Sequence, residues 1–232
     1  AFLGKPDGST YAHFTMENCY AGADVEVKGS KRSGGLIATT AKKYIAIKNC
    51  YFTGKLSGEA SQGKGGLIGF IGDSKATAET IKVNNSYAVT TGNDPVVAAK
   101  GYAQYANYTN VYGTKGGHAS ASGIVVLSKD QMTGEAAKKH MPGLDFVLTW
   151  KTVDGETPEF KTTTERAAMV WVGPTDSDTD FEGGGTKDNP YLISSGAELY
   201  GMATSGAGDT KGKYYKLTKD IYLNDVADSN WK

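Results

Sequence analysis

The chain has 232 residues with 25 basic and 25 acidic side chains, so its formal net charge is zero. That balance disfavours a nucleic-acid-binding protein, in which basic side chains dominate the surface. The longest clean apolar runs, such as residues 123–127, are far shorter than the roughly 20 residues that span a bilayer, so no membrane insertion is expected. Glycine supplies 31 residues and proline only 6, which indicates frequent tight turns rather than a proline-rich linker.

The cysteines and histidines narrow the chemistry further. Cys19 and Cys50 cannot build a disulfide-rich scaffold, and the chain contains no C-x-x-C pair for zinc. His13, His118 and His140 are far apart in sequence, and none belongs to an H-E-x-x-H arrangement. A disulfide-rich scaffold, a C-x-x-C zinc site and an H-E-x-x-H metal site are therefore not expected.

A short segment recurs along the first half of the chain. Asn18-Cys19-Tyr20 returns as Asn-Cys-Tyr at 49–51, as Asn-Ser-Tyr at 85–87 and as Asn-Val-Tyr at 110–112, with steps of 31, 36 and 25 residues. An alternating apolar pair precedes each copy: Phe14 and Met16, Ile45 and Ile47, Ile81 and Val83, and Ala106 and Tyr108. Apolar alternation with a period of two, closed by turn residues, predicts short strands.

A second motif recurs with the same spacing as the first copies of the Asn-Cys-Tyr segment. Gly-Gly-Leu-Ile-Ala at 34–38 returns 31 residues later as Gly-Gly-Leu-Ile-Gly at 65–69. A repeat of this length with two short strands cannot bury its own apolar face, whereas stacking successive repeats as coils of a β-solenoid does. Because stacked coils lie about 4.8 Å apart, equivalent residues are expected to form columns. The predicted columns are Asn18/Asn49/Asn85/Asn110, Tyr20/Tyr51/Tyr87/Tyr112 and Cys19/Cys50/Ser86.

These residues resemble a known family. Gly-Leu-Ile-Gly at 66–69, and more loosely Gly-Leu-Ile-Ala at 35–38, resemble the GLUG motif, which is typically accompanied by a segment like Asn-Cys-Tyr-Phe-Thr-Gly at 49–54. GLUG repeats occur in large bacterial surface and secreted proteins, including adhesin-like proteins and non-catalytic parts of immunoglobulin-A-cleaving metallopeptidases. The resemblance covers residues 1–165 and implies an all-β fold, a right-handed parallel β-helix.

The segment after the repeats predicts a cap. Ser128 and Gln131 have capping-box spacing, residues 136–139 favour helix, and Pro142 stops it. Residues 146–161, with an Asp-Gly turn in their middle, read as a hairpin. Their order is similar to the segment that commonly ends a GLUG solenoid, where a small helical and hairpin cap protects the exposed coil edge.

Three domains are expected from the whole pattern. Residues 1–165 form the solenoid with its cap, residues 166–185 form a Gly- and Asp-rich linker, and residues 186–232 begin a second β-rich module that resembles the opening of another β-helix. Both ends of the chain look cut out of something longer.

Asp176, Asp178 and Asp180 form the candidate metal site. They supply carboxylates at positions 1, 3 and 5 of an EF-hand-like calcium loop. The pattern then departs from that motif, since Phe181 stands where glycine is needed and Lys187 where glutamate is needed. Calcium is therefore a candidate ligand and no cofactor is certain; a solvated acidic linker is the alternative interpretation.

Three further patterns have structural alternatives. Residues 58–65 approximate a phosphate-binding loop, but Gly65 replaces the required Ser or Thr, and the segment lies between two predicted strands. Cys19 and Cys50 would lie in adjacent coils as free thiols or as a disulfide. The tyrosines at 102, 105, 108 and 112 suggest a sugar-binding platform or, alternatively, a structural ladder.

The sequence thus predicts a non-enzymatic structural or adhesive repeat module of a large extracellular bacterial protein. The alternative is an accessory substrate- or glycan-binding β-helix module of a secreted enzyme that acts on glycans or proteins. The expected location is extracellular or at the bacterial cell surface, and the expected partner is a host or bacterial surface protein or glycan. An open coil edge also allows end-to-end self-association.

Overall fold

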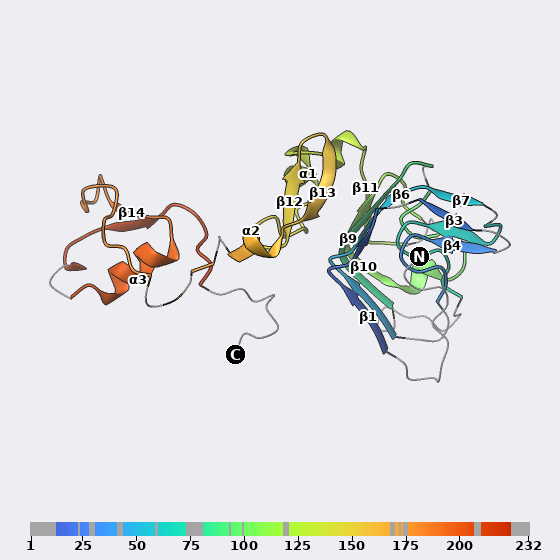
Figure 1. Cartoon of the computed structure of the whole chain (residues 1–232), viewed down its shortest axis with the longest axis horizontal. Helices are drawn as coiled ribbons and strands as arrows, with labels where there is room; N and C mark the ends of the chain where they lie inside the picture. The colour runs from blue at the N-terminus through green and yellow to red at the C-terminus, as the bar shows by residue number, and fades with distance from the viewer. Residues whose placement is uncertain are drawn as a thin grey trace. The chain divides into compact units, whose positions relative to one another are not determined.

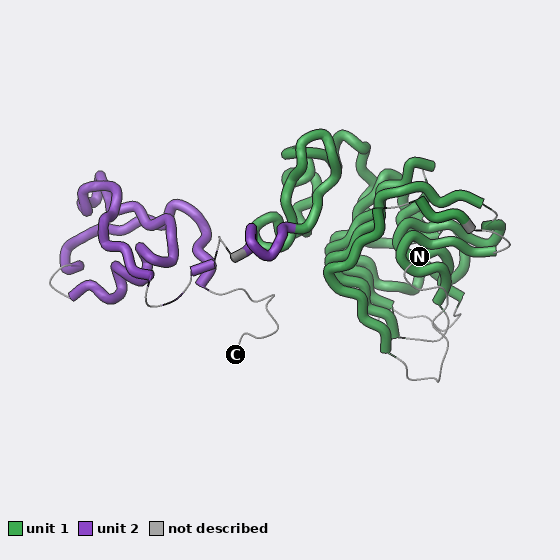
Figure 2. Tube along the Cα trace, viewed as in Figure 1, with its two compact units in different colours: residues 1–160 green, residues 161–232 purple. Residues whose placement is uncertain are grey.

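The computed structural model divides the chain into two compact units, residues 1–160 and 161–232 (Figure 2). It describes residues 13–22, 24–27, 31–40, 44–58, 60–72, 81–92, 94–98, 100–117, 121–167, 170, 171, 173, 176–206 and 210–223. Strands far outnumber helices among these residues, which confirms the mainly β composition expected from the sequence.

The first unit is built from short strands that pair with strands one repeat away (Figure 1). Its strands before the cap are β1 (His13–Glu17), β2 (Tyr20–Ala21), β3 (Val25–Val27), β4 (Arg32–Gly34), β5 (Tyr44–Lys48), β6 (Tyr51–Gly54), β7 (Leu56–Gly58), β8 (Gly63–Gly65), β9 (Ile81–Thr90), β10 (Asn107–Gly113) and β11 (Ile124–Val126), with the 3₁₀ turn η1 (Ala103–Tyr105). All pairings among these strands are parallel, and the largest sheet has seven strands.

The predicted apolar pairs define the register of that sheet. Phe14 lies opposite Ile45, and Ile45 lies opposite Ile81. The second position of each pair follows the same rule, since Ile47 lies opposite Val83 and Val83 opposite Tyr108. Because side chains alternate across a strand, this register directs both members of every pair to one face. That face forms the main apolar core of the unit.

The Gly-Gly-Leu-Ile motif forms a second column of parallel contacts. Gly34 pairs with Gly65 in β4 and β8, and Ile37 bridges to Ile68. Glycine is required here because the backbones approach closely: a Cβ added at Gly35 would lie 2.3 Å from the ring of Phe52 and from the carbonyl oxygen of Gly66. The leucine and isoleucine of each copy are fully buried.

Four asparagines mark the corner between the two strand segments of each repeat. Asn18, Asn49, Asn85 and Asn110 have φ values of 52°, 49°, 48° and 53°, and among the described residues they are the only non-glycine residues with positive φ. Asparagine tolerates the left-handed region better than most residues because its short polar side chain bonds locally. The recurring asparagine is therefore a backbone requirement as well as a side-chain column.

A fifth corner, which the internal repeats of the sequence do not reveal, follows the four asparagines. Since Val111 lies opposite Ile124 in β10 and β11, Gly123 takes the place that Asn110 holds in the preceding repeat. Gly123 has a φ of 86°, and a Cβ there would lie 2.0 Å from the carbonyl oxygen of Tyr108. This repeat thus retains the left-handed backbone conformation, but glycine has no side chain that could extend the asparagine column.

The cap has the elements that the sequence predicts. They are the 3₁₀ turn η2 (Asp130–Met132), the helix α1 (Ala136–His140) and the antiparallel strands β12 (Trp150–Val153) and β13 (Glu156–Phe160). Ser128 and Gln131 exchange side-chain to backbone hydrogen bonds of 2.9 and 3.3 Å, as a capping box requires. Gly155 closes the hairpin with a φ of 70°.

The second unit contains α2 (Thr163–Ala167), β14 (Tyr191–Ile193), α3 (Gly196–Thr204) and β15 (Tyr215–Leu217). β14 and β15 pair in parallel across α3, and Ser195 with Glu198 forms the capping box of that helix. This strand–helix–strand order agrees with the sequence, while the assignment of residues 186–232 as the start of another β-helix stays a prediction.

The described part of the predicted linker, residues 166–185, is packed within the second unit. The amide of Asp178 donates to the carbonyl of Ala197 (3.1 Å), and Glu182 forms an antiparallel bridge with Leu192. Trp171 packs on Tyr200, with ring centroids 5.0 Å apart. The polar, glycine-rich composition indicates turns, and the aromatic rings within the segment gain free energy by burial. The assignment of residues 166–185 as a separate linker stays a prediction.

The corner geometry makes a direct prediction for Asn85. Asn85→Ala is expected to lower the free energy of unfolding by about 1 kcal/mol more than Asn85→Gly, because alanine resists positive φ and glycine does not. Both variants lose the same side-chain hydrogen bonds, so glycine is the matched control. Urea denaturation followed by circular dichroism measures the difference; equal losses in the two variants would contradict the backbone role.

Candidate functional site

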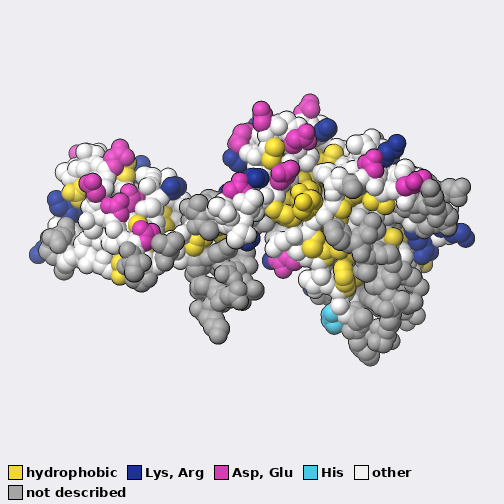
Figure 3. All heavy atoms as spheres, viewed as in Figure 1, with side chains coloured by type: hydrophobic (Ala, Val, Ile, Leu, Met, Phe, Trp, Pro, Cys, Tyr) yellow, Lys and Arg dark blue, Asp and Glu magenta, His cyan; other side chains and the backbone are white. Residues whose placement is uncertain are grey.

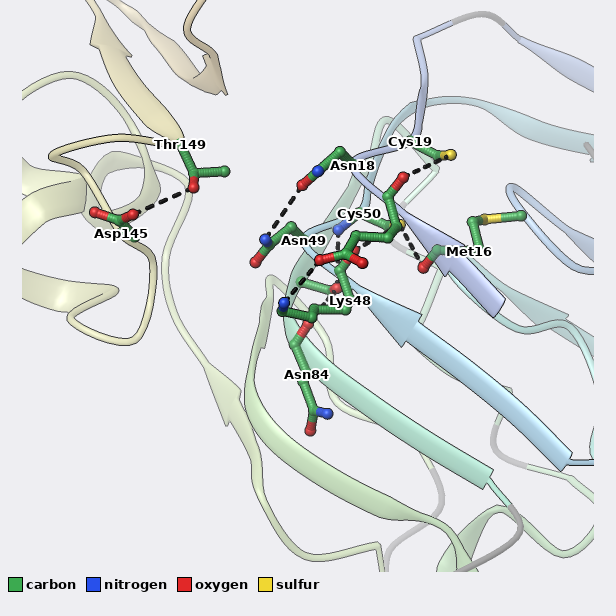
Figure 4. Close-up of polar contacts among 11 residues, drawn as sticks. Met16, Asn18, Cys19, Lys48, Asn49, Cys50, Asn84, Asp145 and Thr149 are labelled. Atoms are coloured by element: carbon green, nitrogen blue, oxygen red, sulfur yellow. Dashed lines mark hydrogen bonds and ion pairs between the residues drawn. The ribbon is translucent and has the colours of Figure 1, made fainter. Parts of the chain in front are cut away.

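The corner asparagines form side-chain hydrogen bonds from one repeat to the next. The amide of Asn49 donates to the side-chain oxygen of Asn18 (3.2 Å), and Asn110 donates to Asn85 (2.9 Å). Figure 4 shows the first of these bonds. Nearby, Lys48 forms an ion pair with Glu17 of the preceding repeat, with the two charged atoms 2.7 Å apart. The asparagine column therefore consists of two bonded pairs rather than one continuous ladder among the described residues.

The tyrosine column is stacked through its first three members. The rings of Tyr20 and Tyr51 lie 4.9 Å apart at 9°, and those of Tyr51 and Tyr87 lie 5.1 Å apart at 8°. Tyr112 pairs in register with Tyr87 but uses its hydroxyl differently, as the acceptor of the Gly143 amide (2.9 Å). The predicted fourth stack is thus replaced by a hydrogen bond to the cap.

The cap covers the tyrosine column with aromatic and aliphatic side chains. Trp150 is fully buried, with its ring centroid 5.6 Å from those of both Tyr51 and Tyr87 and 4.5 Å from that of Phe160. Tyr87 donates its hydroxyl proton to the buried carbonyl of Pro158. The cluster is completed by Tyr112, Met132, Ala137, Met141 and Leu144. Side chains of the repeats and of the cap therefore pack together in a hydrophobic cluster that is separate from the main core of the repeats.

Burial keeps these phenols neutral. Desolvation raises the pKa of Tyr87 well above its usual value, and it also raises the pKa of Tyr51, with a smaller contribution from the charge of Glu159. The pKa of Tyr112 is raised by burial and lowered in part by the Gly143 amide. A neutral phenol that is held away from water suits packing better than acid–base chemistry at neutral pH.

The two cysteines are free thiols in adjacent repeats. The thiol of Cys50 is buried and points toward the carbonyl oxygens of Lys48 (3.1 Å) and Met16 (3.4 Å), and its amide donates to Ser86 Oγ (3.0 Å). The Cys19 thiol instead faces the Glu17 carbonyl (3.2 Å; Figure 4). Desolvation raises the pKa of Cys50 to about 12, so this thiol is unreactive at neutral pH.

The three aspartates of the candidate calcium loop are not brought together. Asp178 Oδ1 accepts the backbone amide of Asp180 (2.9 Å), and the amide of Asp176 is turned toward the Gly173 carbonyl (2.9 Å). Within the described part of the chain, no group of three or more His, Cys, Asp or Glu side chains converges on one point. Calcium binding at Asp176, Asp178 and Asp180 stays a prediction without geometric support.

The phosphate-loop-like segment at 58–65 begins at the last residue of β7 and includes the whole of β8, so among the described residues no helix follows it directly, as one does in a phosphate-binding loop. Its lysine, Lys64, donates to the carbonyl of Leu56 (3.2 Å) in the same repeat. Glu59 of this segment and His118 lie outside the described residues. His13 stacks on Tyr44 at 4.6 Å.

The predicted tyrosine platform divides into two pairs. Tyr108 and Tyr112 are buried, whereas Tyr102 and Tyr105 are 37% and 48% exposed, with ring centroids 6.2 Å apart at 18°. Sequence reasoning also missed a cleft in the second unit that is lined by Phe181, Tyr191 and Tyr215. The sequence feature that could have indicated this cleft is that both parallel strands begin with a tyrosine, Tyr191 and Tyr215.

Comparison of the chain with protein-family models, with curated proteins and with solved structures finds no match. None of the helices in the described ranges is long and apolar enough to cross a membrane.

The thiols provide a test of the corner packing. Iodoacetamide at pH 8 is expected to modify Cys19 in the native chain, and Cys50 only after unfolding in urea, because burial suppresses the Cys50 thiolate. Intact-mass analysis counts the adducts. In the control variant Cys50→Ser, the urea-dependent adduct should disappear. Equal labelling of both thiols in the native chain, or a mass that rises on reduction, would contradict this arrangement.

The hydroxyl of Tyr87 provides a test of the cap. Tyr87→Phe is expected to cost about 1–3 kcal/mol of unfolding free energy, because the buried Pro158 carbonyl loses its donor. Tyr51→Phe is the matched control, since no described residue bonds the Tyr51 hydroxyl, and it should cost less than about 0.5 kcal/mol. Urea denaturation followed by near-ultraviolet circular dichroism measures both; similar costs would refute the assigned hydrogen bond.

Proposed function

We propose that this chain is a non-enzymatic structural and adhesive segment of a large extracellular bacterial protein. In this proposal the first unit is a right-handed parallel β-helix of the GLUG type, and its role is to hold and present other parts of the protein. The GLUG-like residues at 35–38 and 66–69 are one support, since such repeats occur in bacterial surface and secreted proteins.

The single observation that carries the proposal is the in-register pairing of successive repeats. Tyr20 pairs with Tyr51 and Tyr51 with Tyr87, while Gly34 pairs with Gly65 on another sheet. When each repeat contacts mainly its neighbours, stability adds along one axis and the array resists bending and extension. A stiff element whose length depends on repeat number suits presentation at a distance.

The aromatic cap supports the same role. An uncovered parallel array presents unpaired backbone groups and apolar rings at its end, and both favour aggregation. Trp150 and Phe160 cover the tyrosine column from the side, and Tyr87 is bonded to the cap backbone. This cover lies at the side of the column, and no described strand pairs with the outer edges of β1 and β11, so end-to-end self-association stays a proposed interaction beside attachment to a surface protein or glycan.

Mechanical unfolding of the full chain tests the structural role. Force spectroscopy between terminal handles is expected to give a distinct rupture event for the first unit, with a gain in contour length on the order of 500 Å for residues 13–160. Asn85→Ala should lower the rupture force and Asn85→Gly should lower it less. Extension of the first unit without a distinct rupture event would contradict a mechanical role for this unit.

A further inference from the structure

The second unit contains a cleft of about 530 Å³, within the size range of small-molecule sites. It lies where the loop before β14 meets the two strands and the end of α3. Its side-chain lining consists of Thr179, Asp180, Phe181, Tyr191, Ser205 and Tyr215. Half of these side chains are aromatic, and the others have hydroxyl or carboxylate oxygens.

The aromatic wall comes from register and from one loop residue. Tyr191 and Tyr215 are direct partners in the parallel pair β14–β15, so their rings project on the same face, with centroids 5.5 Å apart at 45°. Phe181 stands at 88° to Tyr215, with centroids 5.6 Å apart. All three rings are half-buried. They are fixed by mutual packing and still leave apolar surface that a ligand can cover.

The polar wall offers hydrogen-bond acceptors. Ser205 Oγ donates its proton to the Gly201 carbonyl (2.7 Å), which leaves its oxygen lone pairs as acceptors. The Asp180 carboxylate is exposed and has no hydrogen-bond or ion-pair partner among the described residues, while its backbone amide is held by Asp178. A carboxylate accepts from two hydroxyl groups at once and bonds them more strongly than a neutral acceptor.

The local charge selects against anions. Asp176, Asp178, Asp180 and Glu182 lie within one loop of the cleft, and Lys213 contributes one positive charge, 5.7 Å from the centre of the Tyr191 ring. On the face drawn in Figure 3, acidic side chains gather over the middle of this unit, at the left of the view. Like charges repel across a partly desolvated site, so an anionic ligand is disfavoured.

We propose that this cleft is a binding site for a neutral saccharide. The C–H face of a sugar ring stacks on Tyr191 or Tyr215, and its hydroxyl groups donate to Asp180 and Ser205. The proposal goes beyond the mechanical role of the first unit and uses only residues of the second unit, so either can fail without the other.

Saturation-transfer NMR and calorimetry on the full chain test the site. The probes are methyl glycosides of glucose, galactose, mannose and N-acetylglucosamine, lactose, and 3′-sialyllactose as the anionic counterpart of lactose. Neutral probes should bind with Kd in the micromolar to millimolar range, and 3′-sialyllactose should bind more weakly than lactose. Tyr191→Leu and Asp180→Ala should each weaken binding about tenfold or more.

The matched control is Tyr214→Leu, because Tyr214 precedes Tyr215, is 50% exposed and does not line the cleft. The Tyr214→Leu variant should bind the neutral saccharides with the affinity of the wild-type chain. Asp180 is exposed, so Asp180→Ala keeps its fold and decides the matter if Tyr191→Leu unfolds. Three results overturn the proposal: no neutral probe binds the wild-type chain, Asp180→Ala retains full affinity, or Tyr214→Leu loses affinity as Asp180→Ala does.

Discussion

The first unit depends on one backbone constraint, a left-handed corner that recurs at the same register in each repeat. Parallel strands pair without slipping only if each repeat turns at an equivalent residue. The corners at Asn18, Asn49, Asn85 and Asn110 share φ values within a few degrees of one another. In the four repeats with an asparagine corner, this turn directs the tyrosine two positions later to the same position in the register. The aromatic stack and the cap core then follow from the corner.

The cap and the repeats stabilise each other through unlike contacts. Within the column, identical rings stack nearly parallel, at 8° and 9°. Between column and cap, the rings meet at steep angles, 51° for Tyr87 with Trp150 and 65° for Tyr51 with Phe160. Both geometries are favoured for aromatic pairs. The parallel stack runs from one repeat to the next along the column, whereas the tilted contacts join one side of the column to the cap.

Much of the first unit could be predicted from sequence because its pattern is periodic. The recurrence of Asn-x-Tyr and of the apolar pairs fixes strands and register together, and Ser128 with Gln131 marks the cap by a local rule. The fifth corner was hidden because Gly123 satisfies the same φ with a different residue, which leaves no asparagine to recognise. Side-chain bonding along the asparagine column depends on small shifts between repeats, which periodicity does not encode.

The second unit was harder to predict for the opposite reason. Its segments occur once, so nothing repeats to reveal which residues meet. The polar residues around Phe181 indicated a linker, yet that ring packs against both Tyr191 and Tyr215 and lines the cleft with them. The three aspartates have calcium-loop spacing, and the backbone amide of Asp180 donates to the side-chain carboxylate of Asp178, so one of the expected ligand oxygens is used within the loop. Spacing in sequence describes a metal site only if the backbone follows the matching turn.

The meeting of Gly143 with Asn110 restricts how such a protein can lengthen over evolution. A Cβ at Gly143 would lie 2.0 Å from Asn110, and the next corner, Gly123, has no side chain to continue the column. The last asparagine repeat and the cap are therefore fitted to each other by close packing. Duplicated repeats would be accommodated ahead of Asn107, where each corner meets another of its kind, and not between Asn110 and the cap.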